Sequence, residues 1–454
     1  MQYAYQTPGP QGTLLLSRPE LTWPIRPQDD AKIVKIELRL NGEPLAARYE
    51  NGAVRATPAT PLAPGSYTAE CRVRFAPTQD DARVSWRFTV APDATPSPPP
   101  PTAWAREALQ AANQLRAGLG LAPLQLDSRL CGAAQAHASY LHKNNVIGHG
   151  EVPGKPGFTG DNPLARAQVF GYLASLAEDV SFADGSPEKI VRGLFAAPYH
   201  RLPFLRPGSL VFGAGNTGRS SGLLFGGDGV GGTTVSPYDG ETGVPTTWRN
   251  DESPNPTRFW PQAPRVVGYP IVLAHYAGPN TVLNVERASL KTSAGAEVPC
   301  LLNTPARDTE LHYACLLIPQ APLKPNTTYL VEVVAREVTR RWRFTTTGSP
   351  NDADFGPLDL HPDDLKLLGT VVTAERGKGV LQLRVTRAQG YAAPEKELTK
   401  PLTVTLRLTP STRFVSESNR SGTVTLTPGL PLAVIVPNGP LDRPLNARSV
   451  ILLR

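Results

Sequence analysis

The amino-acid sequence predicts a multidomain protein in which one layered α+β domain is flanked by all-β domains. The chain has 454 residues, which is too many for a single hydrophobic core. It contains 48 prolines and 40 glycines, and only 7% of its residues are aromatic, which is typical of many short strands and turns. Helical periodicity is concentrated in residues 104–198, whereas alternating strand patterns fill most of the remainder.

Six segments are expected along the chain. They are a β-sandwich (1–90), a proline-rich linker (91–103), an α+β domain with α-β-α layers (104–234), a connector (235–257), a second β-sandwich (258–348) and a β-rich unit (349–454).

The first segment has three alternating runs, at 33–40, 66–75 and 84–90, as half-buried strands require. The linker that follows, "APDATPSPPPPTA", has four consecutive prolines and no bulky apolar residue. We expect it to be a stiff, extended spacer.

The α+β segment begins with helices and ends with strands. Helices are predicted at 104–120, 127–146, 162–172 and 186–198, and strands at 209–216 and 221–228. Helices followed by a short sheet favour an α-β-α layered domain.

Two stretches of the β segments are similar to each other. "PLAPGSYTAECRVRF" (61–75) resembles "PLKPNTTYLVEVVAR" (322–336), and "VSWRFTV" (84–90) resembles "RRWRFTT" (340–346). Both copies resemble bacterial immunoglobulin-like domains, in which a tyrosine near a strand start, here Tyr67 or Tyr329, ties down the preceding turn. Chance similarity between two β-rich segments is the alternative.

The last hundred residues are predicted to form a small β-barrel of the OB type. Strand patterns occur there at 367–385, 401–409, 422–436 and 447–453. The segment lacks the aromatic platform on which a single-strand nucleic-acid binder stacks its bases.

Charge and hydropathy exclude several classes of function. The net charge is +7, but no run of five lysines or arginines occurs, so nucleic-acid binding is not expected. A weak attraction to anionic polymers, such as a cell-envelope polymer, or to membrane surfaces stays open. No stretch of about 18 apolar residues predicts a transmembrane helix. The first residues lack the pattern of a signal peptide, so either the protein stays inside the cell or the sequence is that of a mature form with a start methionine added.

The four cysteines are Cys71, Cys131, Cys300 and Cys315, and no CxxC motif occurs among them. Cys300 and Cys315 lie in one segment with strand character at both ends, so we expect a disulfide across a hairpin. Cys71 and Cys131 are expected to be lone buried thiols.

Four ordered motifs carry a family resemblance. They are "NQLRAGLGLAPLQLDSRLCGAAQAHASYL" (113–141), "GHGE" (148–151), "LAEDVSF" (176–182) and "AAPYHRLPFLRPGSLVFGAG" (196–215). Together they resemble the CAP superfamily (cysteine-rich secretory proteins, antigen 5, pathogenesis-related 1), also called SCP-like. The resemblance covers about a quarter of the chain and places it among bacterial multidomain proteins with immunoglobulin-like domains.

The resemblance implies a central cleft at which two histidines and two acidic residues converge. The matching positions are His149, His200 and Glu178, whereas the second acidic position falls on Ala197. Glu151 is a further candidate because it lies two residues past His149. Two imidazoles and a carboxylate are donors that zinc or another divalent cation could bind weakly, or they could form a hydrogen-bonded network without metal.

By resemblance, we expect a secreted or cell-surface protein that is monomeric and a binder rather than an enzyme. Its cleft would take a small lipid, glycan or peptide, while the β domains act as spacers or attachment modules. The alternative is a divalent-metal-dependent hydrolase acting on peptide or cell-wall material, and a third interpretation is a purely structural domain. The missing second carboxylate removes an obvious general base.

The remaining candidates have structural interpretations. His137 is expected in the core and His142 at the surface, and Tyr199 in packing. Arg201 is expected either to form a salt bridge or to bond to carbonyls at a helix end. His275, His312 and His361 stand alone in β segments. Neither a GxSxG elbow nor an HExxH motif occurs, so serine hydrolases and zincins are not indicated.

Overall fold

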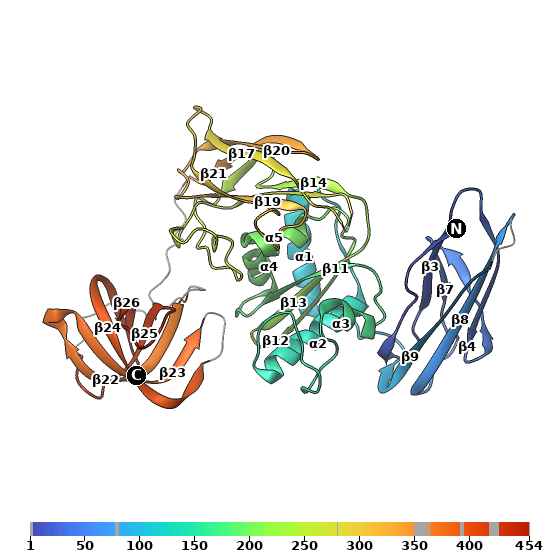
Figure 1. Ribbon diagram of the computed structural model, residues 1–454, viewed down its shortest axis with the longest axis horizontal. Coiled ribbons are helices and arrows are strands. Elements are labelled where there is room, and N and C mark those ends of the chain that lie inside the picture. The colour runs from blue at the N-terminus through green and yellow to red at the C-terminus, as the bar shows by residue number, and fades with distance from the viewer. Residues whose placement is uncertain are drawn as a thin grey trace. The chain divides into compact units, whose positions relative to one another are not determined.

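The computed structural model describes residues 3–77, 81–278, 280–348, 360, 364–390, 395–416 and 426–453. Figure 1 shows its helices and strands, coloured along the chain. The chain divides into two compact units. The first unit comprises residues 1–144, 148–192 and 208–230, and the second comprises 145–147, 193–207 and 231–454. The units therefore do not follow the predicted domain boundaries, because residues 193–207 of the predicted α+β domain belong with the second unit.

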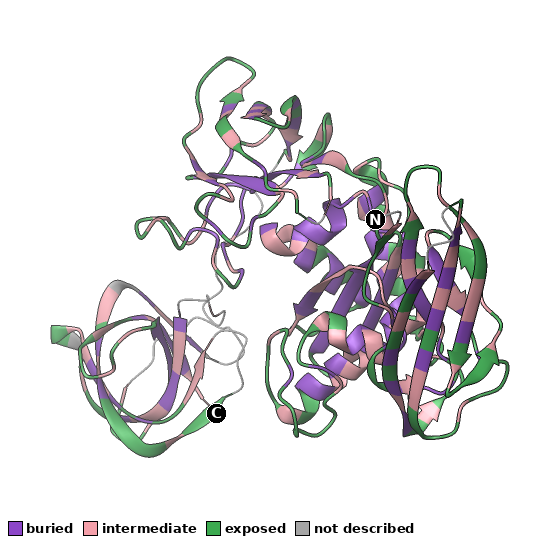
Figure 2. Ribbon diagram, turned by 45° about the vertical axis from the view of Figure 1, so that its right-hand side comes forward, coloured by how far each residue is buried: buried purple, intermediate pink, exposed green. Residues whose placement is uncertain are grey.

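The N-terminal segment of the first unit is a sandwich of two sheets, as predicted. One sheet has the order β1-β3-β7-β6 and the other β2-β9-β8-β4-β5. Buried residues alternate with intermediate or exposed ones along much of β8 and β9, as the colours of Figure 2 show. The strands are β1 (Tyr3–Tyr5), β2 (Gly12–Leu16), β3 (Leu21–Pro27), β4 (Lys32–Leu40), β5 (Glu43–Leu45), β6 (Arg48–Glu50), β7 (Ala53–Ala56), β8 (Gly65–Ala76) and β9 (Asp81–Thr95).

The predicted boundary at residue 90 is too early. Strand β9 continues to Thr95, because Thr95 pairs with Leu16 of the parallel strand β2. The extended spacer is shorter than expected and ends at Thr102, whose hydroxyl caps the next helix by accepting from the Ala105 N–H at 3.1 Å.

The α+β segment contains five helices and four strands among the described residues, and its sheet has the order β10-β12-β13-β11. The elements are α1 (Ala103–Gly118), β10 (Gln125–Leu126), α2 (Ser128–Asn144), α3 (Pro163–Val169), β11 (Leu176–Ser181), α4 (Pro187–Ala196), α5 (Pro198–Leu205), β12 (Val211–Thr217) and β13 (Ser220–Gly226). Helix α5 was not predicted, because Pro203 lies inside it and argues against helix.

Two glycines of β12 let helix α2 lie directly on the sheet. A Cβ at Gly213 would stand 2.3 Å from the Leu130 backbone, and one at Gly215 would stand 2.3 Å from the Gln135 backbone. The small residues Ala133 and Ala134 are buried at this contact. Leu15 of β2 packs against the same core cluster, so the N-terminal sandwich shares in it.

The second unit contains a second sandwich of two four-stranded sheets, β14-β16-β19-β18 and β15-β21-β20-β17. Its strands are β14 (Gly232–Ser236), β15 (Glu241–Val244), β16 (Ile271–Tyr276), β17 (Val285–Thr292), β18 (Cys300–Asn303), β19 (Ala314–Pro319), β20 (Thr328–Ala335) and β21 (Thr339–Thr346). The predicted connector therefore contributes β15 and the end of β14 to this sandwich.

The two sequence copies fold alike around their tyrosines. The Tyr67 hydroxyl donates to the Ala63 carbonyl at 2.8 Å, and the Tyr329 hydroxyl accepts from the Lys324 N–H at 2.8 Å. Each tyrosine also stacks on the phenylalanine that it faces across the sheet, with ring centroids 5.5 Å apart in both copies. The expected tie between tyrosine and preceding turn is confirmed in each copy.

The expected disulfide between Cys300 and Cys315 is wrong, since all four cysteines are free. Strands β18 and β19 pair so that Cys300 faces Pro319, four residues beyond Cys315. Four residues of strand span about 13 Å, whereas a disulfide needs Cα atoms within about 7 Å. The strands are consecutive, as predicted, but their register keeps the two thiols apart.

The C-terminal segment is a closed barrel with the order β22-β23-β24-β26-β25, which confirms the predicted small barrel. Strands β24 and β26 pair parallel, and the other neighbours pair antiparallel. The strands are β22 (Asp364–Glu375), β23 (Val380–Gly390), β24 (Lys396–Ser416), β25 (Pro431–Pro437) and β26 (Leu445–Leu452). Residues 422–425 of the third predicted strand lie outside the described residues. No described helix has the length and apolar character needed to cross a membrane.

Candidate functional site

Two of the predicted cleft residues meet in the first unit. His149 lies in the loop after α2, and Glu178 lies in the middle of β11, opposite Leu224 of β13. The His149 Nδ1 atom is 2.9 Å from Glu178 Oε2. The imidazole is 50% exposed, whereas the carboxylate is only 2% exposed. The His149 ring is therefore accessible to solvent, while the Glu178 carboxylate that it contacts is buried.

Arg166, a buried residue that was not predicted from the sequence, donates hydrogen bonds to the Glu178 carboxylate. Arg166 of α3 donates from Nη2 to both oxygens of Glu178, at 2.7 and 2.8 Å, and from Nη1 to the His149 carbonyl at 2.9 Å. Burial opposes ionisation of Glu178, but the hydrogen bond from His149 and the charge of Arg166 outweigh it and lower the pKa of Glu178. Glu178 is therefore ionised at neutral pH, and His149 donates to it from Nδ1.

Glu151 supports the loop that carries His149 and does not reach the His149 ring. Its carboxylate lies 2.9 Å from His137 Nδ1 and accepts from the Thr159 N–H at 2.6 Å. His137 is fully buried and its Nε2 also bonds to the Gly148 carbonyl at 3.1 Å. The expectation of His137 as a satisfied core histidine is confirmed, and His142 is exposed as predicted.

His200 lies in the second unit and has its own buried carboxylate, Glu252. Ala197 supplies no acid, as the sequence indicated, and Glu252 Oε1 lies 2.6 Å from His200 Nδ1. The same carboxylate accepts from the backbone N–H groups of Tyr199 at 3.1 Å and His200 at 2.9 Å. Glu252 has no exposed side-chain surface. Only tertiary structure brings it to His200 from 52 residues away.

Glu252 also caps helix α5. The N-cap residue Ala197 has no side-chain hydrogen bond, and Pro198 occupies the first turn. Tyr199 and His200 carry backbone donors that the helix itself cannot satisfy. The Glu252 carboxylate therefore caps the N-terminus of α5 and also orients the His200 imidazole.

The neighbours of His200 have structural roles. Arg201 is fully buried and donates to the carbonyls of Phe195 at 2.7 Å and Ala196 at 2.9 Å, which confirms its predicted bonds at a helix end. The Tyr199 hydroxyl bonds to Asp308 and accepts from Arg258 at 2.7 Å. His275 Nδ1 is 2.8 Å from the Thr233 hydroxyl, and His361 lies outside the described residues.

The donor set does not favour Glu178 as a metal ligand. Both of its oxygens face the Arg166 guanidinium, so a cation there would lie beside a fixed positive charge. Within the described ranges, no group of three or more His, Cys, Asp or Glu side chains is arranged to hold a metal ion. The meeting of His149 and His200 in one cleft stays a prediction, because the two residues belong to different compact units.

One comparison with known proteins matches the α+β segment. The CAP family model, described as the cysteine-rich secretory protein family, matches residues 109–222. No curated protein matches the sequence.

Three solved structures are similar to parts of this chain. An extracellular protein containing an SCP domain from Bacillus anthracis is 13% identical over 50% of this chain and 68% of its own, with a TM-score of 0.25. A cysteine-rich secretory protein from Staphylococcus aureus is 14% identical over 50% and 84%, with a TM-score of 0.22. Fibronectin(III)-like modules of Clostridium thermocellum CbhA are 6% identical over 76% and 94%, with a TM-score of 0.16. These likenesses carry no argument about function.

Proposed function

We propose that this chain binds a small ligand at its CAP cleft and does not catalyse a reaction on it. The proposal proceeds from the match of residues 109–222 to the CAP family. The flanking β domains would act as spacers or attachment modules, and the OB type is our proposal for the barrel. We also propose an extracellular or cell-surface location, in keeping with the secretory family that the domain matches.

The arrangement of Glu178 carries this proposal. A general base must reach a water or substrate proton and must be basic enough to take it. The Glu178 side chain is only 2% exposed, and both of its oxygens accept hydrogen bonds from Arg166. Its lowered pKa also makes it a weak base. What remains for a ligand is the half-exposed imidazole of His149, whose Nδ1 is already engaged.

A binding measurement with matched histidine variants tests the proposal. Native mass spectrometry of the full chain would use palmitate, chitotetraose and a tetrapeptide as probes for a lipid, a glycan and a peptide. His149→Ala should abolish the complex with whichever probe binds. His142→Ala removes another exposed histidine from the same domain and should leave the complex intact.

The rival hydrolase makes a different set of predictions. It requires stoichiometric zinc binding that is lost in His149→Ala, together with zinc-dependent cleavage of a peptide or cell-wall substrate. Those two results would replace the binding proposal. Failure of all three probes in the wild type would also contradict it.

A further inference from the structure

His137 is a buried histidine whose two ring nitrogens both face hydrogen-bond acceptors. It lies on α2 in the first unit, and its side chain is 0% exposed. Nδ1 lies 2.9 Å from Glu151 Oε1, and Nε2 lies 3.1 Å from the Gly148 carbonyl oxygen. A neutral imidazole has one N–H donor and one acceptor nitrogen, so it can satisfy only one of these two partners. An imidazolium donates to both of them.

The surroundings of Glu151 exclude the alternative, in which a protonated carboxyl donates to a neutral His137 ring. Oε2 of Glu151 accepts from the backbone N–H groups of Thr159 at 2.6 Å and Gly160 at 3.3 Å. Arg166 Nε lies 3.8 Å from Oε1. Burial opposes ionisation, but the hydrogen bonds that the carboxylate accepts and the charge of Arg166 outweigh it and lower the pKa of Glu151. Glu151 is therefore ionised, and the proton that it shares with His137 belongs to the ring.

The charges buried around His137 also call for a cation at this position. The side chains of Glu151, Arg166 and Glu178 are each at most 2% exposed. Arg166 always carries its charge, and both carboxyls are ionised because the pKa of each is lowered. With a neutral His137 ring, one negative charge would stay buried without compensation, which is costly. With an imidazolium, the charges of these four side chains, the buried charge network, cancel.

Two cations of the buried charge network hold the backbone on both sides of His149. His137 Nε2 donates to the Gly148 carbonyl at 3.1 Å, and Arg166 Nη1 donates to the His149 carbonyl at 2.9 Å. Glu178 holds the His149 ring itself, 2.9 Å from Nδ1. The ring is 50% exposed, so water can compensate any charge on it. The position of His149 thus depends on both of its flanking peptide groups and on its ring contact.

We propose that His137 is a buried imidazolium at neutral pH and that it positions His149 for ligand binding by holding the Gly148 carbonyl. His137 has no exposed surface and touches no ligand, so it is a positioning residue. Its charge follows from its own contacts and does not depend on the proposed function. Its effect on ligand binding rests on that function.

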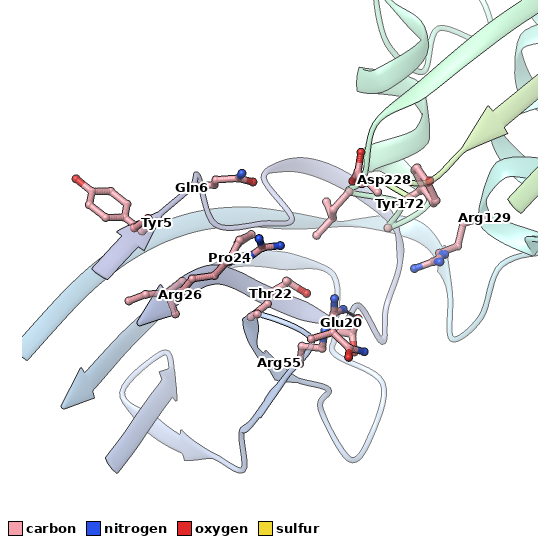
Figure 3. A pocket seen from close by; sticks show the side chains of 18 residues that line it. Tyr5, Gln6, Glu20, Thr22, Pro24, Arg26, Arg55, Arg129, Tyr172 and Asp228 are labelled. Carbon is pink, nitrogen blue, oxygen red and sulfur yellow. Dashed lines mark hydrogen bonds and ion pairs between the residues drawn. The ribbon is translucent and has the colours of Figure 1, made fainter. Parts of the chain in front are cut away.

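The pocket shown in Figure 3 is a different part of the first unit. It has a volume of about 510 Å³, and no member of the buried charge network lines it. Its side chains Arg55 and Glu20 pair with each other at 2.7 Å. A ligand bound in that pocket would therefore not contact His137.

A long-range ¹H–¹⁵N spectrum of the histidine-labelled full chain near pH 8 tests the charge. His137 should show two protonated ring nitrogens, whose protons exchange slowly with water because the ring is buried. His142, an exposed histidine of the same helix, supplies the reference pattern for a ring in contact with water. His137→Gln and His142→Gln assign the two sets of signals. One unprotonated nitrogen on His137 in the wild type would overturn the proposal.

The same two variants test the positioning role. In His137→Gln, the His149 ring should lose its single tautomer, whereas His142→Gln should leave it unchanged. A probe that binds the wild type in native mass spectrometry should bind His137→Gln about tenfold more weakly, which corresponds to one lost hydrogen bond to a charged group. His142→Gln should bind it as the wild type does. Equal behaviour of the two variants, in the His149 signals or in binding, would overturn the positioning role.

Alkaline titration of the wild type tests the positioning role if His137→Gln does not fold. Loss of the second ring proton from His137 should change the His149 signals at the same pH, and unchanged His149 signals would overturn the role. If none of the probes binds the wild type, the proposed function fails while the spectra still decide the charge and the positioning of His149. The titratable or charged side chains around the ring that bear on this titration are Glu151, Arg166, Glu178 and Tyr140, whose ring stacks on His137 at 6.4 Å.

Discussion

Replacing Glu252 with alanine should loosen helix α5 selectively. The buried carboxylate accepts from two backbone N–H groups of the first helical turn and from the His200 ring. A helix cap contributes about 1 kcal/mol, and a hydrogen bond to a charged group about 1.5–3 kcal/mol. Because the donors share one carboxylate and water can enter the emptied space, we expect a loss of about 2–4 kcal/mol in the local opening free energy.

Hydrogen exchange measured by mass spectrometry on the full chain reads out this loss directly. A change of about 2–4 kcal/mol corresponds to exchange about 30- to 700-fold faster at the α5 amides, since 1.4 kcal/mol is a factor of ten. Glu252→Gln retains an acceptor oxygen and should accelerate exchange less than Glu252→Ala.

Asp251→Ala is the matched control, because Asp251 is the adjacent residue and forms a partly exposed ion pair with Arg249. Such pairs contribute about 0–1 kcal/mol, so α5 exchange should change little. Equal exchange in Glu252→Ala and Asp251→Ala would refute the assignment of Glu252 as the cap of α5.

Three further outcomes are expected. Tyr329→Phe should cost about 1 kcal/mol, the contribution of one hydrogen bond, in the unfolding of the second sandwich, and an unchanged midpoint would contradict the turn tie. Because the pKa of Glu178 is lowered in the folded state, its ionised carboxylate stabilises the fold at pH values above the ordinary carboxyl pKa. This stabilisation is lost as the pH falls through the pKa that Glu178 has in the folded protein. The gap in melting temperature between wild type and Glu178→Gln should therefore narrow on acidification, and a constant gap would count against the ion pair. Thiol titration in denaturant should find four free thiols, and only two would restore the disulfide; in the folded protein, burial raises the pKa of Cys315 to about 12, so it should react slowly at pH 8.

The elements that local chemistry specifies were predictable. Helix α2 starts at Ser128, one residue after the predicted start, and Asp127 accepts from the Arg129 N–H at 2.8 Å. The tyrosine turns of both sandwiches also followed from the sequence, because each involves residues four or five positions apart. Such contacts between residues close in sequence can be predicted from the local sequence pattern.

The parts that depend on distant residues were not predictable. Helix α5 contains Pro203, and its end is held by Glu252 from a different segment. Arg166 showed no local signal beyond its place on a short helix, since its partner Glu178 lies on β11. The expected disulfide was wrong because of the register between β18 and β19, which cannot be predicted from the residues between Cys300 and Cys315.

We propose that Glu178 orients His149 for ligand binding and acts neither as a base nor as a metal ligand. The most direct measurement is a long-range ¹H–¹⁵N spectrum of the histidine-labelled protein near pH 8, with and without equimolar zinc. The chain has seven histidines, so His149 can be assigned by substitution. We predict the tautomer with the proton on Nδ1, unchanged by zinc and lost in Glu178→Gln. A proton on Nε2 in the wild type, or a zinc-dependent shift of the His149 nitrogens, would contradict this role of Glu178.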